Sequence, residues 1–359
     1  MWKGPIMVAS SHLNSADRIR HLSTELDTSI TRAGSGIETV NSQARLLAIN
    51  IQIEAARLGL HGRAFQVLGN EMVTFSAQTG VIAKDLRERT KNLVDELSAI
   101  SARLATEVKG TRLADLALAN IDLIDRNLYE RSCDCRWWAT DGAFVARLEN
   151  PSEKATRYAS ERMAVILKAY TVYFDIVLTD LAGRVLANGR PGDYASVGQV
   201  VAQQAWFRSA LACADGESFG FQSVHDSALV NGERVLVYAC KVCRGGDAKG
   251  EPLGVLGVVF RWNALAEKIM ASTAVDEADR PQARAFLADP EGTVLADSRG
   301  GALREPFRLP NEVLRDRIGK GYFLEEAPGG RRLIAYARAP GFETYSTGWY
   351  SFVTVHLPG

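Results

Sequence analysis

The sequence predicts a mixed α and α/β fold, in which an antiparallel coiled-coil hairpin precedes two modules built on antiparallel sheets and carried by a long helix. Three observations predict it. Apolar residues recur at intervals of three and four over about the first 100 residues, two glycines interrupt that pattern, and two later segments repeat one another. We therefore expect an N-terminal segment over 1–14, the hairpin over 15–110, a long helix with the first module over 111–270, and the second module over 271–359.

The first arm of the hairpin is predicted to be one uninterrupted helix. No proline occurs between Ser15 and Leu58, so the helix can extend for about 65 Å at about 1.5 Å per residue. Its apolar residues form one narrow seam, which a lone helix cannot bury. The seam consists of Leu22, Leu26, Ile30, Ala33, Ile37, Val40, Ala44, Leu47 and Ile51.

The pattern breaks at Gly59 and Gly62, where we expect a tight reversal at 59–62, because glycine readily takes the positive φ that ends a helix. A second helix then returns with the same spacing. Two such hairpins would form a four-helix bundle as a dimer. The returning seam consists of Phe65, Leu68, Met72, Phe75, Ile82, Leu86, Leu93, Leu97, Ile100 and Leu104.

The last two thirds of the chain contain an internal repeat. The segment 180–187 matches 289–296 at an offset of 109 residues, and both contain an Asp and a Gly at the ends of a four-residue turn. A second match joins 232–239 to 330–337, and each copy ends on an apolar strand, at 253–262 and 348–355. Each copy is predicted to be a hairpin, a helix and a three-stranded meander.

Composition limits the classes of function. Lys and Arg number 42 and Asp and Glu also 42, so net charge gives no support for nucleic acid as a partner. No stretch approaches the 20 or so apolar residues of a membrane-spanning helix, and the first 12 residues lack the features of a secretory signal. We expect no membrane insertion and a cytoplasmic location. Five cysteines in a chain of this length fit reduced thiols.

The run from Leu46 to Gly59, followed by 62–67 and Glu71, resembles the hairpin tip of methyl-accepting chemotaxis proteins. That resemblance implies a tip that binds a chemotaxis histidine kinase and its coupling protein, and homodimers that gather into a trimer of dimers. An ordinary coiled coil with a solvated face is the alternative. The matching residues are Asn50, Glu54, Arg57, Arg63, Phe65 and Glu71.

The tip departs from the family pattern at several positions. Ala44 and Arg45 replace a Thr-Asn pair, Leu60 replaces the glutamate of the turn, and Ala64 replaces a glycine. The segment 73–77 also differs from the family sequence. These departures concern control of the kinase more than they concern the hairpin itself.

The repeated modules resemble a double Cache sensor, which is a pair of PAS-like modules stacked along one helix. The segments 173–188, 205–208 and 254–261 carry this resemblance. It implies a small-molecule ligand. In most relatives the sensor is extracellular and precedes the signalling helices, whereas here it follows them.

In amino-acid-binding double Cache domains, an Arg-x-Trp-Tyr stretch holds the ligand. Here the corresponding residues are Gln204, Ala205, Trp206 and Phe207, which keep the aromatic pair and lack the arginine. A pocket for a small molecule needs a few polar groups among aromatic ones, so we predict one in the first module, while the alternative is that Trp206 and Phe207 are simply core. The predicted residues are Tyr173, Trp206, Phe207, Arg208, His225, Asp226 and Tyr238.

Four cysteines offer a rival function as a zinc or redox sensor. Cys133, Cys135, Cys240 and Cys243 could together supply four thiolates. Against a zinc site, residues two apart on a helix point to different faces, and reduced, buried thiols are the simpler interpretation. The sequence has no catalytic triad, phosphate loop or His-Glu metal motif, so we expect no enzyme and no other cofactor.

Overall fold

The computed structural model describes residues 11–304 and 306–358. The chain divides into two units, residues 1–109 and 110–359, and helix α2 contributes to both. Residues 1–10 of the predicted N-terminal segment lie outside the described residues. Residues 11–14 already belong to the first helix, so the hairpin begins earlier than predicted. None of the described helices is long and apolar enough to cross a bilayer.

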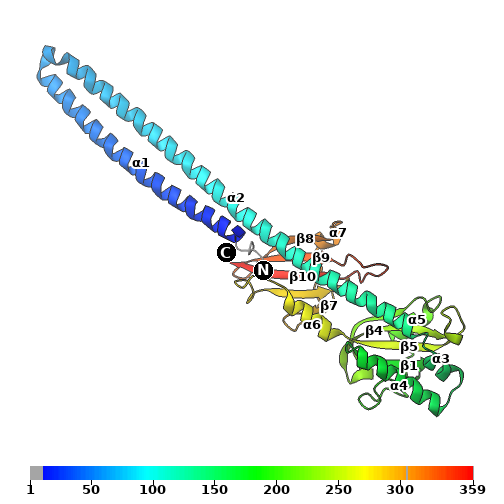
Figure 1. Cartoon of the computed structure of the whole chain (residues 1–359). Helices are drawn as coiled ribbons and strands as arrows, with labels where there is room; N and C mark the ends of the chain where they lie inside the picture. The colour runs from blue at the N-terminus through cyan, green and yellow to red at the C-terminus, as the bar shows by residue number, and fades with distance from the viewer. Residues whose placement is uncertain (1–10, 305, 359) are drawn as a thin grey trace, which may run out of the picture. The chain divides into compact units, whose positions relative to one another are not determined.

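The first unit is the predicted helical hairpin. Helix α1 (Ser11–Arg57) leads through the short 3-10 turn η1 (Gly59–Gly62) into α2 (Arg63–Trp138) (Figure 1). Gly59 has a φ of +55°, and a Cβ atom at Gly62 would lie 2.1 Å from the carbonyl oxygen of Ala55. Gly62 therefore has no room for a side chain, Gly59 has the positive φ that favours glycine, and the predicted reversal at 59–62 is confirmed.

Small residues pack between the two helices of the hairpin. Ala48, Ala55 and Ser76 are buried, and the Ser76 hydroxyl donates to the carbonyl oxygen of Asn41 at 3.1 Å. In contrast, Leu47 is 53% exposed. Within one chain the seam is only partly covered: Ile30, Ile37 and Ile51 are half-buried, whereas the leucines of the seam stay exposed. The periodicity of the sequence indicates an apolar stripe on each helix, but it does not indicate which helix packs against that stripe.

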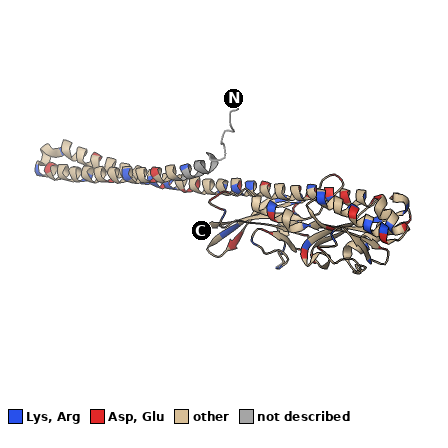
Figure 2. Cartoon of the chain, turned by 60° about the horizontal axis from the view of Figure 1, so that its bottom comes forward, with Lys and Arg blue, Asp and Glu red and all other residues tan. Residues whose placement is uncertain are grey.

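The seam leucines and other large apolar residues lie mainly on the outside of the hairpin. The exposed large side chains include Leu22, Leu26, Val40, Leu46, Phe65, Leu68, Phe75, Ile82, Leu86, Leu93, Leu97 and Leu104. Acidic and basic residues are interspersed in both units (Figure 2), in agreement with their equal numbers in the sequence.

The second unit contains two antiparallel five-stranded sheets. The first has the order β2-β1-β5-β4-β3. Its strands are β1 (Tyr173–Asp180), β2 (Val185–Asn188), β3 (Gly220–Ser227), β4 (Glu233–Cys243) and β5 (Pro252–Arg261). Helix α5 (Ala205–Ala212) joins β2 to β3, and the 3-10 turns η2 (Ala228–Val230) and η3 (Arg244–Gly246) follow β3 and β4.

The second sheet repeats this order as β7-β6-β10-β9-β8. Its strands are β6 (Arg284–Ala288), β7 (Val294–Asp297), β8 (Lys320–Ala327), β9 (Gly330–Arg338) and β10 (Tyr350–Pro358). Helix α6 (Trp262–Ser272) links the sheets, and α7 (Asn311–Arg315) takes the place of α5. The hairpin, helix and meander predicted from the repeat are therefore confirmed.

The repeated Asp/Gly turns have the same hydrogen bonds. In the first, the backbone N–H groups of Gly183 and Arg184 donate to the backbone and side chain of Asp180; Gly292, Thr293 and Asp289 are arranged identically. Gly183 and Gly292 have φ values of +77° and +90°, which other residues rarely adopt. This explains why the aspartate and glycine recur in the sequence.

Helix α2 packs along the inner faces of both sheets (Figure 1). Ile121, Ile124 and Leu128 of this helix are fully buried in one core with Leu256 of the first sheet and Val353 of the second. The outer faces carry separate cores, one under α5 and one that includes Val313 of α7. Helices α3 (Gly142–Glu149) and α4 (Glu153–Ala169) precede β1 and are capped by Asp141 and Ser152.

Candidate functional site

The first sheet separates the residues that were predicted to form a pocket in the first module. Side chains alternate between the two faces of a strand. Tyr173 and Tyr238 belong to the inner core, which contains α2, whereas Trp206 and Phe207 belong to the outer core. The structure therefore does not bring the predicted residues together.

Trp206 and Phe207 are packed among aliphatic side chains. Both are almost fully buried, and their core includes Val177, Val237 and Val259. A Cβ atom at position 257 would lie 3.0 Å from the Trp206 ring, so Gly257 lets the indole lie directly on β5. Both side chains therefore belong to the hydrophobic core of the outer face.

The inner tyrosines hydrogen-bond to other elements. The Tyr173 hydroxyl donates to Asp134 of α2 at 2.5 Å, and the Tyr238 hydroxyl lies 2.7 Å from that of Tyr345 in the second module. Burial raises the pKa of both Tyr173 and Tyr238 well above the usual range. These phenols hold the modules and α2 together.

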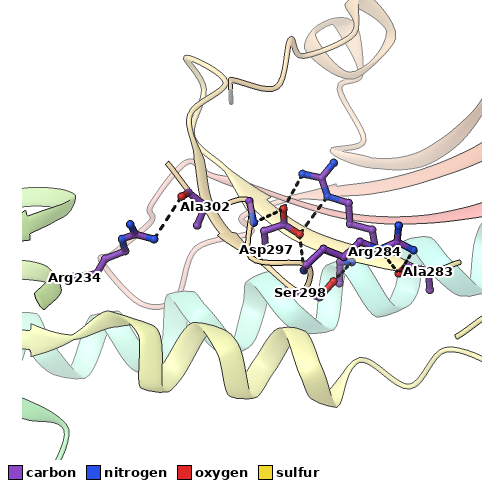
Figure 3. A network of polar contacts seen from close by, with 9 residues as sticks. Arg234, Ala283, Arg284, Asp297, Ser298 and Ala302 are labelled. Atoms are coloured by element: carbon purple, nitrogen blue, oxygen red, sulfur yellow. Dashed lines mark hydrogen bonds and ion pairs between the residues drawn. The ribbon is translucent and has the colours of Figure 1, made fainter. Parts of the chain in front are cut away.

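The remaining predicted residues lie near the surface. Arg208 and Asp226 are exposed, and Asp226 forms an ion pair with Arg234 at 3.2 Å. His225 is partly buried, its Nδ1 lies 2.8 Å from the Ser223 carbonyl oxygen, and burial lowers its pKa. Arg234 also donates to the carbonyl oxygen of Ala302 at 3.5 Å, which joins the two modules (Figure 3).

Asp175 is a buried carboxylate on the outer face that sequence analysis missed. Its side chain accepts hydrogen bonds from the Asn188 amide at 2.8 Å and from the backbone N–H groups of Ile176, Gly189 and Arg190. Burial raises the pKa of Asp175 to about 6 in spite of these bonds. The available signal was one acidic residue within the apolar run of β1.

In the second module, the positions equivalent to Asp175 and Asn188 are occupied by Arg284 and Asp297, each 109 residues further along the chain. Arg284 donates from Nε and Nη2 to the two carboxylate oxygens of Asp297, at 3.2 and 2.8 Å (Figure 3). Asp297 also accepts from the backbone N–H groups of Arg299 and Gly301. Burial alone would raise the pKa of Asp297, but these hydrogen bonds outweigh it and lower the pKa.

A cavity of about 380 Å³ lies beside this ion pair on the outer face of the second sheet. Such a volume falls within the range of small-molecule sites. No sequence motif indicates this cavity, because its lining comes from separate strands and loops. The lining residues are Pro281, Gln282, Arg284, Phe286, Arg299, Phe307, Arg332, Ile334, Thr354, Val355 and His356.

Comparison with known families decides what kind of module this is. A family model of the Cache domain matches residues 78–357, which is most of the chain. The chain belongs to the Cache domain family.

Two curated relatives match part of this Cache domain protein. Methyl-accepting chemotaxis protein McpQ of Pseudomonas putida is 32% identical over 108 residues, which are 29% of this chain and 16% of McpQ. Methyl-accepting chemotaxis protein HlyB of Vibrio cholerae is 31% identical over 87 residues, which are 23% of this chain and 16% of HlyB. The matches therefore span only a small part of either relative.

Solved structures share the fold of the Cache domain. The Vibrio cholerae histidine kinase DctB sensor domain has a TM-score of 0.52 at 14% identity, with 69% of this chain and 98% of that domain covered. The Campylobacter jejuni chemoreceptor Tlp3 ligand-binding domain, in complex with L-valine, has a TM-score of 0.50 at 15% identity, with coverages of 68% and 91%.

The four predicted cysteines of the Cache domain do not gather at one point. Cys135 is buried near Cys240, and its thiol donates to the carbonyl oxygen of Leu256 at 3.9 Å, whereas Cys133 accepts from Arg136 at 3.2 Å. Cys243 is buried beside the carbonyl oxygen of Ala248. All five cysteines are free, and within 11–304 and 306–358 no three His, Cys, Asp or Glu side chains are placed to share a metal ion.

The residues that match the chemoreceptor tip all lie on the surface of the hairpin. Glu54 and Arg57 form an ion pair at 2.8 Å, with both side chains more than half exposed. Asn50, Arg63, Phe65 and Glu71 are exposed as well. The tip therefore offers these side chains to solvent rather than using them to hold the two helices together.

Proposed function

We propose that the protein is a signal transducer whose Cache domain binds a small molecule and whose helical hairpin acts on a chemotaxis-type histidine kinase and its coupling protein. The observation that carries this proposal is that one helix, α2, both forms an arm of the hairpin and packs against the two sheets. Membership of the Cache family and the matches to two methyl-accepting chemotaxis proteins support it.

Two carboxylates attach α2 to the modules, one to each. Asp134 accepts from Tyr173 of the first module. Asp125 is fully buried and accepts from Thr347 and from the backbone of Gly341 in the second module, and burial raises its pKa. A ligand that favours one arrangement of a module would therefore shift the equilibrium position of α2, in proportion to its differential affinity.

The hairpin is proposed to act as a homodimer, with a second copy of the chain covering its outer apolar face. Large exposed side chains recur at helical spacing on both arms, and a four-helix bundle would bury them. Gathering of dimers into trimers through the tip is the further step that the chemoreceptor resemblance implies. The cytoplasmic location and the lack of enzymatic activity stay predictions.

Binding of the full chain to the kinase and to the coupling protein tests the proposal. We expect both to bind, and we expect Glu54→Ala with Arg57→Ala to weaken binding at least about tenfold if the exposed ion pair is part of the contact. The matched control is Asp85→Ala with Arg89→Ala, which removes another exposed helical ion pair from the same hairpin. Failure of the native chain to bind either partner would contradict the kinase role.

A redox sensor is the second candidate, favoured by the proximity of the buried Cys135 and Cys240, which lie on α2 and β4. A disulfide there would fix α2 to the first sheet. Treatment with hydrogen peroxide would then oxidise the two thiols to a disulfide with release of water, and mass spectrometry would detect the loss of two hydrogens. Bound zinc, measured by elemental analysis and lost in Cys240→Ser, would instead favour the metal alternative.

A further inference from the structure

We propose that the cavity of the second module binds a small organic carboxylate with an apolar body, held by Arg284, Arg299 and Arg332. This inference rests on the proposed sensor function and names its ligand class and its module. It differs from the sequence-based prediction, which placed the ligand beside Trp206 in the first module.

The lining of the cavity is cationic on its walls and apolar on its floor. Three arginines and His356 line it, and no Asp or Glu is among the described residues that do so. Phe286, Phe307 and Ile334 belong to the apolar core beneath it. A site with this composition favours a ligand that combines a negative charge with an apolar surface.

Arg284 is held in place before any ligand arrives. Asp297, whose side chain is 1% exposed, binds two of its nitrogens, and the guanidinium lies 4.7 Å from the centre of the Phe286 ring. Gly301 is part of this arrangement, since a Cβ atom there would come within 2.3 Å of an Asp297 oxygen. The Nη1 group has no hydrogen bond within the described part of the chain, so it can donate to a ligand.

Arg299 and Arg332 supply the charge that Asp297 does not balance. The Arg299 guanidinium donates to the carbonyl oxygens of Pro281 and Ala283, and no described carboxylate lies within ion-pair distance of it. Arg332 lies 3.4 Å from Glu325, with both side chains about half exposed, where an ion pair contributes little. The cavity thus has two positive charges that are weakly compensated or uncompensated.

The shape of the donors favours a carboxylate over other anions. A guanidinium presents parallel N–H groups that match the two oxygens of a planar carboxylate. The aromatic rings of the floor would contact an apolar body, which inorganic phosphate lacks. The cavity volume of about 380 Å³ accommodates such a molecule.

Isothermal titration of the full chain with benzoate, phenylacetate and hexanoate, each compared with its uncharged amide, tests the proposal. We expect at least one acid to bind at millimolar concentration or below, and at least about tenfold more tightly than its amide, because a hydrogen bond to a charged group is worth more than a neutral one. Arg299→Gln with Arg332→Gln should weaken that binding about tenfold or more, while leaving the Arg284–Asp297 pair intact.

The matched control is Arg331→Gln, the neighbour of Arg332 on β9, whose side chain points to the other face of the strand. It should bind as the native protein does. Three results would overturn the proposal: no acid binds, acid and amide bind equally, or inorganic phosphate binds as tightly as the best acid. Binding that survives Arg299→Gln with Arg332→Gln and is lost in Trp206→Phe would place the ligand in the first module. Kinase binding is measured separately, so the sensor function and this site can fail independently.

Discussion

The two modules share one backbone plan and differ in the chemistry of equivalent positions. Asp175 and Asn188 of the first correspond to Arg284 and Asp297 of the second, at the same offset and on the same pair of strands. A carboxylate occupies the position on β1, and a guanidinium occupies that on β6. The fold therefore fixes where a buried polar pair stands without fixing its charge, which is how one scaffold can serve different ligands.

The two modules also differ in which elements supply the aromatic side chains of the outer core. In the first, Gly257 and Val177 leave room for Trp206, which comes from α5. In the second, the equivalent strand residues are Phe352 and Phe286, whose rings stack at 4.9 Å. The aromatic side chains of the outer face thus come from helix α5 in the first module and from strands β6 and β10 in the second. In the second module the helix on this face, α7, has only five residues.

Trp206→Ala should have the largest effect on this comparison. Removing an indole that is 1% exposed leaves a cavity in the outer core, and we expect a loss of about 3–5 kcal/mol in the free energy of unfolding, measured by urea denaturation. Trp137→Ala is the matched control, since that ring is 69% exposed and should cost little. Equal effects of the two changes would show that Trp206 is not a core residue.

Arg284→Met should have the second-largest effect, a loss of about 3 kcal/mol in the free energy of unfolding, because it leaves the buried Asp297 without its charged partner. The same urea titration measures it. Asn188→Ala, the corresponding disruption in the first module, should cost less, about 1–2 kcal/mol, since Asp175 keeps three backbone N–H donors. A larger cost for Asn188→Ala would contradict the assigned difference between the two pairs.

The two carboxylates should respond to pH in opposite directions. The pKa of Asp175 is raised to about 6 in the folded protein, so its contribution to stability falls as pH rises from about 4 to about 6, by about 2 kcal/mol. The pKa of Asp297 is lowered, so its contribution is present above about pH 4 and is lost as pH falls below that. The difference in unfolding free energy between native protein and Asp175→Asn should therefore change between pH 4 and 6. A pH-independent difference would be contrary to the raised pKa.

Substituting a pair of glycines gives the smallest expected effect. Gly301→Ala places a methyl group against the Asp297 carboxylate, which is held by its hydrogen bonds, and should lower the free energy of unfolding by about 1–2 kcal/mol. Gly192→Ala, at the equivalent position of the first module, meets nothing within 4 Å and should stay within about 0.5 kcal/mol of the native protein. Thermal unfolding of the two variants compares them directly, and equal shifts would remove this distinction between the modules.

Local signals in the sequence predicted the turn at 59–62, the repeated Asp/Gly turns and the succession of hairpin, helix and meander in each copy, because glycine conformation and residue period are properties of short segments. The packing surfaces were not predictable in this way. Whether Leu47 or Ala48 lies between the helices depends on how closely two backbones approach, and whether Tyr173 and Trp206 share a face depends on which side α5 covers. The cavity was missed because its arginines lie on strands and loops whose adjacency is set only by the folded sheet.

The two carboxylates of α2 contact different modules, and the helix fixes the distance between these two points of attachment. Asp125 and Asp134 are nine residues apart on one helix, a separation of about 14 Å along its axis that the backbone hydrogen bonds keep constant. If a ligand changes the distance between the two modules, the helix cannot stretch to follow both. Either the hydrogen bonds at one carboxylate break, or α2 shifts or rotates relative to one module. A change in the distance between the modules would in this way move α2, which is also an arm of the hairpin.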